Sequence, residues 1–482
     1  MTPFLLTLAV AALYVVLLFV VARLSGRGGD NAKFFTGGRN QKWWVVALAM
    51  VGAPMTGVTF VSVPGMVGAS GFSYLQMALG FIVGSVVIAY LLIPLYYRYN
   101  VTSLYEYLDS RFGVCGHSTG AWLFLVSKVM GASLRTFVVC VVVQQLLCTA
   151  LGVPFWVTAV IFMMLVWLYT YRGGVVAVVW TDALKTLCMV LCVVLCAVFL
   201  LRELGIPFVE ATSQAANDNL TKVFYFEDID SPLHFVKMFF AGLFMIVAMT
   251  GLDQDMMQRA LSSSSQRSAQ RNMVVASLLQ AVVIAMLLGL GALLYIYLAK
   301  TGNSVAKPDE VFAFVAMQKG MPMAIPMLLL LGVVAATFSA TGSALTSLTT
   351  SFTVDVLHKK DISIASRKWI HAAIAIVLVL LMLAFERWSN ASSIELFYRL
   401  ASYTYGPLLG LFAFGVLSKR GVRDRVVPIV AIVAPILSLV LDLNSEAWFG
   451  GYNFGFELLL VNALFTIVGL YLSGLRSLHS SK

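Results

Sequence analysis

The sequence predicts an all-α polytopic membrane protein with about 13 transmembrane helices, from its composition, its apolar runs and the placement of its charges. Of the 482 residues, 60% are hydrophobic and 11% are charged, whereas a soluble domain has about 25% charged residues. Apolar runs long enough to cross a lipid bilayer, about 20 residues each, recur along the chain. Most charges lie in the short loops between these runs. We therefore attribute the net charge of +10 to membrane topology rather than to nucleic-acid binding.

Thirteen apolar stretches are predicted to span the membrane: 3–22, 44–69, 73–97, 120–150, 153–171, 175–201, 235–258, 272–299, 321–356, 369–386, 393–417, 426–442 and 454–474. Lys and Arg gather in alternate loops, whereas the loop 203–233 is acidic. Because basic loops stay in the cytoplasm, we predict an N-terminus outside and a C-terminus inside. The first stretch has no Lys or Arg before it, which favours a retained helix over a cleaved signal peptide.

Two of these stretches contain residues that interrupt a helix. In the second stretch, residues 52–57 include two glycines and a proline, which are costly in a helix interior. Residues 249–255 of the seventh stretch carry a similar polar, glycine-containing interruption. Inside a membrane, freed backbone groups persist only where they line a cavity or bind something. The two stretches are five apart and so run in opposite directions, which is typical of the binding site of a transporter with inverted repeats.

Several polar side chains at membrane depth are candidates for function, because such groups are costly there. Asp182 is either a cation ligand or the structural partner of Lys185 on the same helix face. Arg135 either binds a substrate carboxylate with its planar fork or forms an ion pair with Asp253 or Asp255. A row of hydroxyls in the ninth stretch either binds a cation or packs between helices; it comprises Ser339, Thr341, Ser343, Thr346, Ser347, Thr349 and Thr350.

No sequence pattern indicates an enzyme. The five His residues are scattered, and the chain has no Gly-x-x-x-x-Gly-Lys-Ser/Thr phosphate-binding loop. Cys188, Cys192 and Cys196 share one helix face. They are either a metal site or small apolar packing residues, and the second interpretation is favoured because no His or carboxylate accompanies them on that face.

The chain resembles the sodium:solute symporter family over residues 3 to 420. The resemblance rests on FFTGGR at 34–39, WW at 43–44, PG at 64–65, TSLYEYL at 102–108, GGVVAVVWTD at 173–182, QR at 258–259 and YTYGPLLG at 403–410. It implies a LeuT-like fold of five-plus-five inverted helices. The implied units are a first helix and cytoplasmic linker (1–43), a first repeat (44–203), an extracellular loop (204–233), a second repeat (234–417) and two peripheral helices (418–482).

The resemblance also implies where sodium binds. The principal site consists of the carbonyls of Gly52, Met55 and Ala336 and the hydroxyl of Ser339. The next position, which usually carries a second Ser or Thr in the family, is Ala340 here.

A second sodium site, known in some members of the family, would use Asp182 with Ser339 and Ser343. The position three residues after Asp182 is often Gln in the family and is Lys185 here. The ammonium group of this lysine could take the place of that ion, so the chain could couple to fewer sodium ions.

The implied solute site is most similar to that of the sialic-acid-transporting branch. It comprises Thr56, Thr59, Phe60, Arg135, Asp253 and Gln254. In that branch the arginine pairs with the carboxylate of the solute, which predicts a carboxylate-bearing solute such as a sialic acid or a monocarboxylate.

The predicted function is sodium-coupled symport of a small organic solute by alternating access, in the inner membrane of a cell. The alternatives are a sodium-independent or proton-coupled transporter of a sugar or amino acid, and a non-transporting sensor on the same fold. The sequence does not indicate an oligomeric state.

Overall fold

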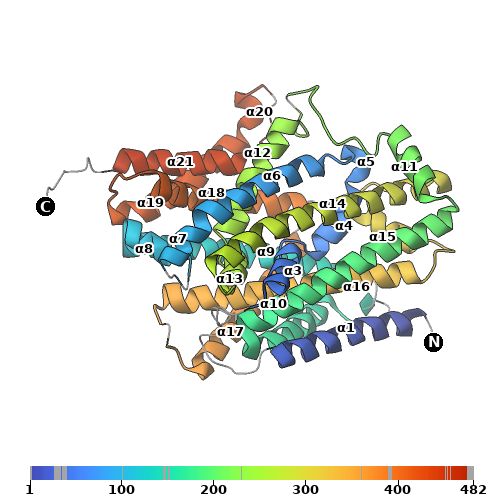
Figure 1. The fold of residues 1–482 in the computed structure, drawn as a ribbon, viewed down its shortest axis with the longest axis horizontal. Helices are drawn as coiled ribbons and strands as arrows, with labels where there is room; N and C mark the ends of the chain where they lie inside the picture. The colour runs from blue at the N-terminus through green and yellow to red at the C-terminus, as the bar shows by residue number, and fades with distance from the viewer. Residues whose placement is uncertain are drawn as a thin grey trace.

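The structure is a computed structural model. It describes residues 3–25, 34, 41–99, 101, 103–144, 148–149, 152–229, 231–359, 361–388, 393–450, 452, 454–455 and 457–474. Within these residues the regular elements are all helices, and most of them run along the long axis of the molecule (Figure 1). Most of the linker predicted before residue 43 lies outside the described residues, including residues 35–39 of the family motif.

The first half of the chain contains the first broken helix. Its elements are α1 (Pro3–Ser25), α3 (Trp43–Gly52), α4 (Gly57–Gly65), α5 (Val67–Ser70), α6 (Tyr74–Val87), η2 (Ile88–Leu92), α7 (Ile93–Arg98), α8 (Glu106–Phe112), α9 (Val114–Val143), α10 (Phe155–Leu204) and α11 (Phe208–Asn217). The long helix α10 holds two of the predicted spans. They are separated at Gly174, whose φ of 50° a residue with a side chain rarely adopts.

The second half begins with the second broken helix. Its elements are α12 (Phe235–Ile246), η5 (Val247–Gly251), α13 (Gln254–Leu261), α14 (Gln266–Thr301), η6 (Pro308–Glu310), α15 (Val311–Ala316), α16 (Ala324–Ser351), η7 (Phe352–Val356), α17 (Ile364–Trp388), α18 (Ser393–Leu417), η8 (Asp424–Val426), α19 (Val427–Leu443), α20 (Ser445–Trp448) and α21 (Leu458–Ser473). In Figure 1, α19 and α21 lie at the end of the molecule away from α1.

The predicted apolar stretches agree with the helices. Among the described residues, seven helices are long and apolar enough to cross a membrane, and two bent pairs raise this number to nine. Four shorter apolar helices occupy the remaining predicted stretches. In Figure 1, α8 and α11 lie at opposite ends of the helices, as the predicted loop positions require. The number of membrane crossings and the side that faces the cytoplasm stay predictions.

Both predicted breaks are present, and local chemistry explains where each new helix begins. The axes of α3 and α4 differ by 57°, and those of the helices before and after residues 252–253 differ by 70°. Thr56 is extended, and its backbone N–H donates to the hydroxyl of Thr59 in a capping box. Asp253 is also extended, and its carboxylate accepts a hydrogen bond from the backbone N–H of Met256. Asp is a favoured residue at such an N-cap position.

Candidate functional site

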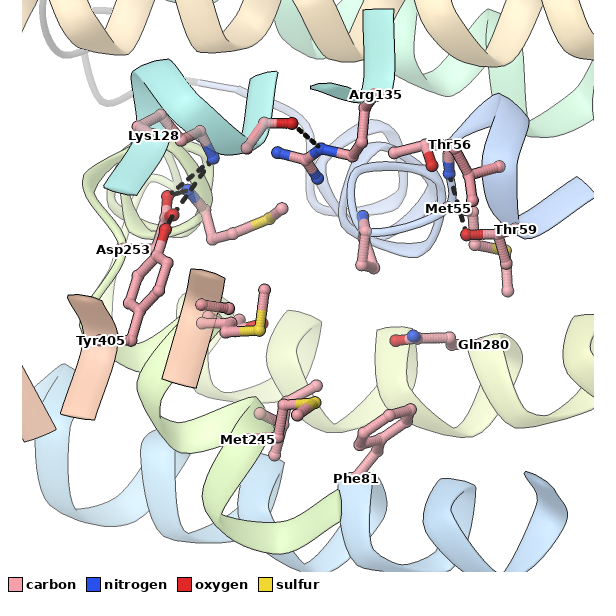
Figure 2. A pocket seen from close by; sticks show the side chains of 18 of the residues that line it. Met55, Thr56, Thr59, Phe81, Lys128, Arg135, Met245, Asp253, Gln280 and Tyr405 are labelled. Atoms are coloured by element: carbon pink, nitrogen blue, oxygen red, sulfur yellow. Dashed lines mark hydrogen bonds and ion pairs between the residues drawn. The ribbon is translucent and has the colours of Figure 1, made fainter. Parts of the chain in front are cut away.

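A cavity of about 110 Å³ lies where the two broken helices approach each other (Figure 2). One water molecule needs about 10–15 Å³ on this measure, so the cavity has room for a small solute. It is lined by residues of both breaks and of α6, α9, α14 and α18. Its polar lining residues are Thr56, Thr59, Tyr74, Ser127, Lys128, Arg135, Thr250, Asp253, Gln280 and Tyr405.

Four of the six predicted solute-site residues line this cavity, namely Thr56, Thr59, Arg135 and Asp253. The other two make different contacts. The buried ring of Phe60 stacks on Phe312 of α15, with ring centroids 5.8 Å apart. The side-chain oxygen of Gln254 accepts a hydrogen bond from the backbone N–H of Leu104 at 3.0 Å. Both side chains therefore contact neighbouring elements and are not among the residues that line the cavity.

Arg135 extends from α9 into the cavity and is half-buried. Its Nε donates to the carbonyl of Gly131, one turn earlier in the same helix, at 3.0 Å. Figure 2 shows its guanidinium between Lys128 on one side and Thr56 on the other. The bond to its own helix fixes the direction of the side chain, so the guanidinium is held toward the space available to a solute.

Lys128 is a site residue that the sequence interpretation missed. Its buried Nζ lies 3.1 Å from Oδ2 of Asp253 and 2.6 Å from Oδ2 of Asp255. The hydroxyl of Tyr405 donates to Asp253 at 2.5 Å. Both aspartates that were considered as partners of Arg135 are thus ion-paired with Lys128. The signal was present, because Lys128 is an ionisable residue inside a predicted membrane span.

Asp182 is paired mainly with a residue from the second broken helix. Nε of Arg259, on α13, lies 2.6 Å from Oδ2 of Asp182, and Nη1 lies 2.9 Å from Oδ1 of Asp255. Lys185, the partner expected from the sequence, is 3.7 Å from Oδ1 of Asp182. The hydroxyl of Ser339 also donates to Asp182. The carboxylate therefore joins α10, α13 and α16 at one buried point.

The hydroxyls of α16 make three kinds of contact, and a role in cation binding stays a prediction. Three of them donate to the carbonyl four residues earlier in the same helix, namely Thr346, Thr349 and Thr350. Thr341 shares a hydrogen bond of 2.8 Å with Thr136 of α9, which is packing between helices. Ser339 and Ser343 instead donate to buried aspartates.

The residues expected to bind the first sodium ion lie in the first broken helix and in α16. Four of them are buried: Gly52, Met55, Ala336 and Ser339. Ala340 is half-buried. A side chain on Gly57 would meet the hydroxyl oxygen of Thr337 at 2.6 Å, which shows how closely the break approaches α16. Unwound carbonyls beside a helix hydroxyl are the oxygen ligands that transporters use for sodium.

Six charged side chains form one buried network between the cavity and α16. Three are acidic and three are basic, namely Asp182, Asp253, Asp255, Lys128, Lys185 and Arg259. Each is at most 5% exposed. Buried charges are tolerated when they are paired, so the balance of three against three is what allows this network at membrane depth.

The chain is similar to known transporters. The family model described as "Sodium:solute symporter family" matches residues 34–424. The human sodium/iodide cotransporter is 26% identical over 251 residues, which cover 52% of this chain and 38% of that protein. The mouse sodium-coupled monocarboxylate transporter 1 is 25% identical over 440 residues, which cover 88% of this chain and 69% of that protein.

The solved structure of a Na⁺-coupled sialic acid symporter has the same fold. It superposes with a TM-score of 0.80 at 19% sequence identity, covering 97% of each chain. A nucleobase-cation-symport transporter, Mhp1, superposes with a TM-score of 0.63 at 14% identity, over 93% of this chain and 95% of that chain. The all-helical, LeuT-like architecture expected from the sequence is therefore confirmed.

Proposed function

This chain belongs to the sodium:solute symporter family, and we propose that it is a secondary active transporter that moves a small organic solute together with sodium. The observation that carries the proposal is the cavity between the two broken helices, whose lining includes Met55 and Thr56 of the first break. The two relatives described above are transporters whose names state that they use sodium. The segment that matches this chain covers 38% of one relative and 69% of the other. Membership of a transporter family gives no reason to expect enzymatic activity from this chain.

The coupling ion of the proposed cycle is sodium, bound between the first break and α16. Its ligands are the carbonyls of Gly52, Met55 and Ala336 and the hydroxyl of Ser339. The burial of these residues supports this assignment. Ala340 supplies a methyl group where a hydroxyl would add a ligand, so sodium binds here with four protein oxygens rather than five.

The proposed solute carries a carboxylate that Arg135 binds. Two features support an anion. The other charged residues that line the cavity, Lys128 and Asp253, are paired with each other, and the half-buried Arg135 presents a guanidinium suited to bidentate binding of a carboxylate. In addition, iodide, monocarboxylates and sialic acid, after which three of the similar proteins are named, are all anions.

The two sites are connected through one segment of backbone. The proposed sodium ligands Gly52 and Met55 come directly before Thr56 and Thr59, which line the solute cavity. Sodium would therefore fix the end of α3 against α16 and order the start of α4, where the solute binds. A ligand can drive a conformational change only through different affinity for the two states. The break would supply that difference if its carbonyls hold sodium only when the break lies against α16.

Uptake into proteoliposomes under an imposed sodium gradient tests this function. We expect accumulation of N-acetylneuraminate or a short monocarboxylate that collapses when choline replaces sodium, and loss of the uptake in Arg135→Ala. Lys222→Met, which removes an exposed positive charge that does not line the cavity, is the control and should keep the uptake. Uptake that responds to pH but not to sodium would refute the proposal that sodium is the coupling ion. Uptake of neutral sugars that is unaffected by Arg135→Ala would refute the proposal that Arg135 binds a carboxylate of the solute. A location in the inner membrane is part of the proposal, and membrane fractionation tests it.

A further inference from the structure

We infer that Lys185 and Arg259 together take the place of a second sodium ion, so that this chain binds one sodium ion and keeps built-in positive charge beside it. The inference uses the proposed function for the first sodium only. It concerns the oxygen atoms of Asp182, Ser339 and Ser343, which the family resemblance implied as the ligands of a second ion.

All three side chains already have partners in the structure. Oδ2 of Asp182 accepts from Nε of Arg259 at 2.6 Å. The hydroxyl of Ser339 donates to the other oxygen of Asp182. The hydroxyl of Ser343 accepts from Nη2 of Arg259 and donates to Asp255. A sodium ion at this position would have to displace the guanidinium from its two side-chain contacts there.

The guanidinium of Arg259 is hydrogen-bonded on its opposite side as well. Nη1 of Arg259 donates to the backbone carbonyl of Asp255 at 2.6 Å and to its carboxylate at 2.9 Å. Each of the three nitrogens therefore has an oxygen partner, and the side chain is 1% exposed. An arginine keeps its proton under all ordinary conditions, so this positive charge is permanent.

Lys185 adds a second positive charge on the side facing the first break. Its Nζ lies 3.7 Å from Oδ1 of Asp182 and has no hydrogen-bond partner among the described residues. A Cβ on Gly52 would lie 2.9 Å from Cε of Lys185, so the lysine packs directly against the break. A sodium ion beside Asp182 would therefore stand between two cations that already share this one carboxylate.

Equilibrium binding of radioactive sodium to the purified full-length protein tests the inference without knowledge of the solute. We expect one sodium ion per chain at saturation in the wild type. In Lys185→Gln/Arg259→Gln, Asp182 loses both cations, and we expect a second sodium ion to bind. Arg259→Lys keeps the charge and should still bind one. The control Arg111→Gln removes a half-buried arginine that donates to the carbonyls of Gly415, Ser418 and Arg420, and should also bind one.

Two bound sodium ions in the wild type would overturn the inference, and this measurement does not depend on whether the variants fold. A double variant that elutes as a folded monodisperse protein but binds no additional sodium would also overturn it. If the wild type binds no sodium, the proposed first sodium site fails. The inference on Lys185 and Arg259 is then judged separately, since the double variant should rise from zero sodium ions to one.

Discussion

Replacing Lys128 with methionine tests whether the ion-pair network holds the second broken helix in place. Methionine has a similar length, so Lys128→Met removes the charge while it keeps most of the volume. The substitution takes away the contacts of 3.1 Å to Asp253 and 2.6 Å to Asp255. Asp253 keeps its bonds from Tyr405 and the Met256 N–H, and Asp255 keeps Arg259.

The expected loss of stability follows from these remaining partners. Removing one partner of a buried ion pair typically costs about 3–5 kcal/mol, because an uncompensated charge stays buried. Since both aspartates keep another partner, we expect the lower end of this range, about 3 kcal/mol. Lys222→Met is the matched control, because its pair with Glu227 is exposed, with side chains 36% and 77% accessible. Exposed pairs contribute less than about 1 kcal/mol.

Thermal unfolding in detergent measures the effect. Lys128→Met should lower the melting temperature by several degrees, whereas Lys222→Met should leave it nearly unchanged. Lys128→Met/Asp253→Asn restores the charge balance and should recover part of the loss, as expected for directly interacting residues. Equal melting temperatures for Lys128→Met and the wild type, or a double variant less stable than the single one, would refute the role assigned to this network.

Three further substitutions test other contacts. Ala340→Ser offers sodium one more oxygen ligand. An added interaction of about 1 kcal/mol should lower the sodium concentration that gives half-maximal thermal stabilisation about five-fold, and an unchanged sodium concentration would argue against sodium at this position. Gly52→Ala would place a methyl group 2.1 Å from the hydroxyl oxygen of Thr186, and such overpacking should cost about 1–3 kcal/mol, seen as a lower melting temperature. Tyr405→Phe removes the donor to Asp253, and the lost hydrogen bond to a charged group should destabilise by about 1.5–3 kcal/mol; an unaltered thermal transition would contradict that contact.

The features that could be predicted from the sequence are those determined by neighbouring residues. Glycine and proline at residues 52–57 interrupt a helix whatever surrounds them, and the structure bends there by 57°. Asp253 could be placed at the second break because the interruption itself was visible. The apolar stretches likewise coincide with helices, since about 20 apolar residues are needed to cross a bilayer.

The partners of the buried charges could not be predicted, because they come from distant parts of the chain. Asp182 and Arg259 are 77 positions apart, and Lys128 and Asp253 are 125 apart. Local spacing favoured Lys185 as the partner of Asp182, but the distance of 3.7 Å shows that this pair is secondary to the one with Arg259.

The equal number of acidic and basic side chains in the buried network bears on how the proposed transporter would respond to membrane voltage. Moving one elementary charge across 100 mV changes the free energy by about 2.3 kcal/mol. The six groups sum to zero, so their movement together during the change between outward-facing and inward-facing states displaces no net charge. The voltage dependence of the cycle is then left to the sodium ion, the solute and Arg135.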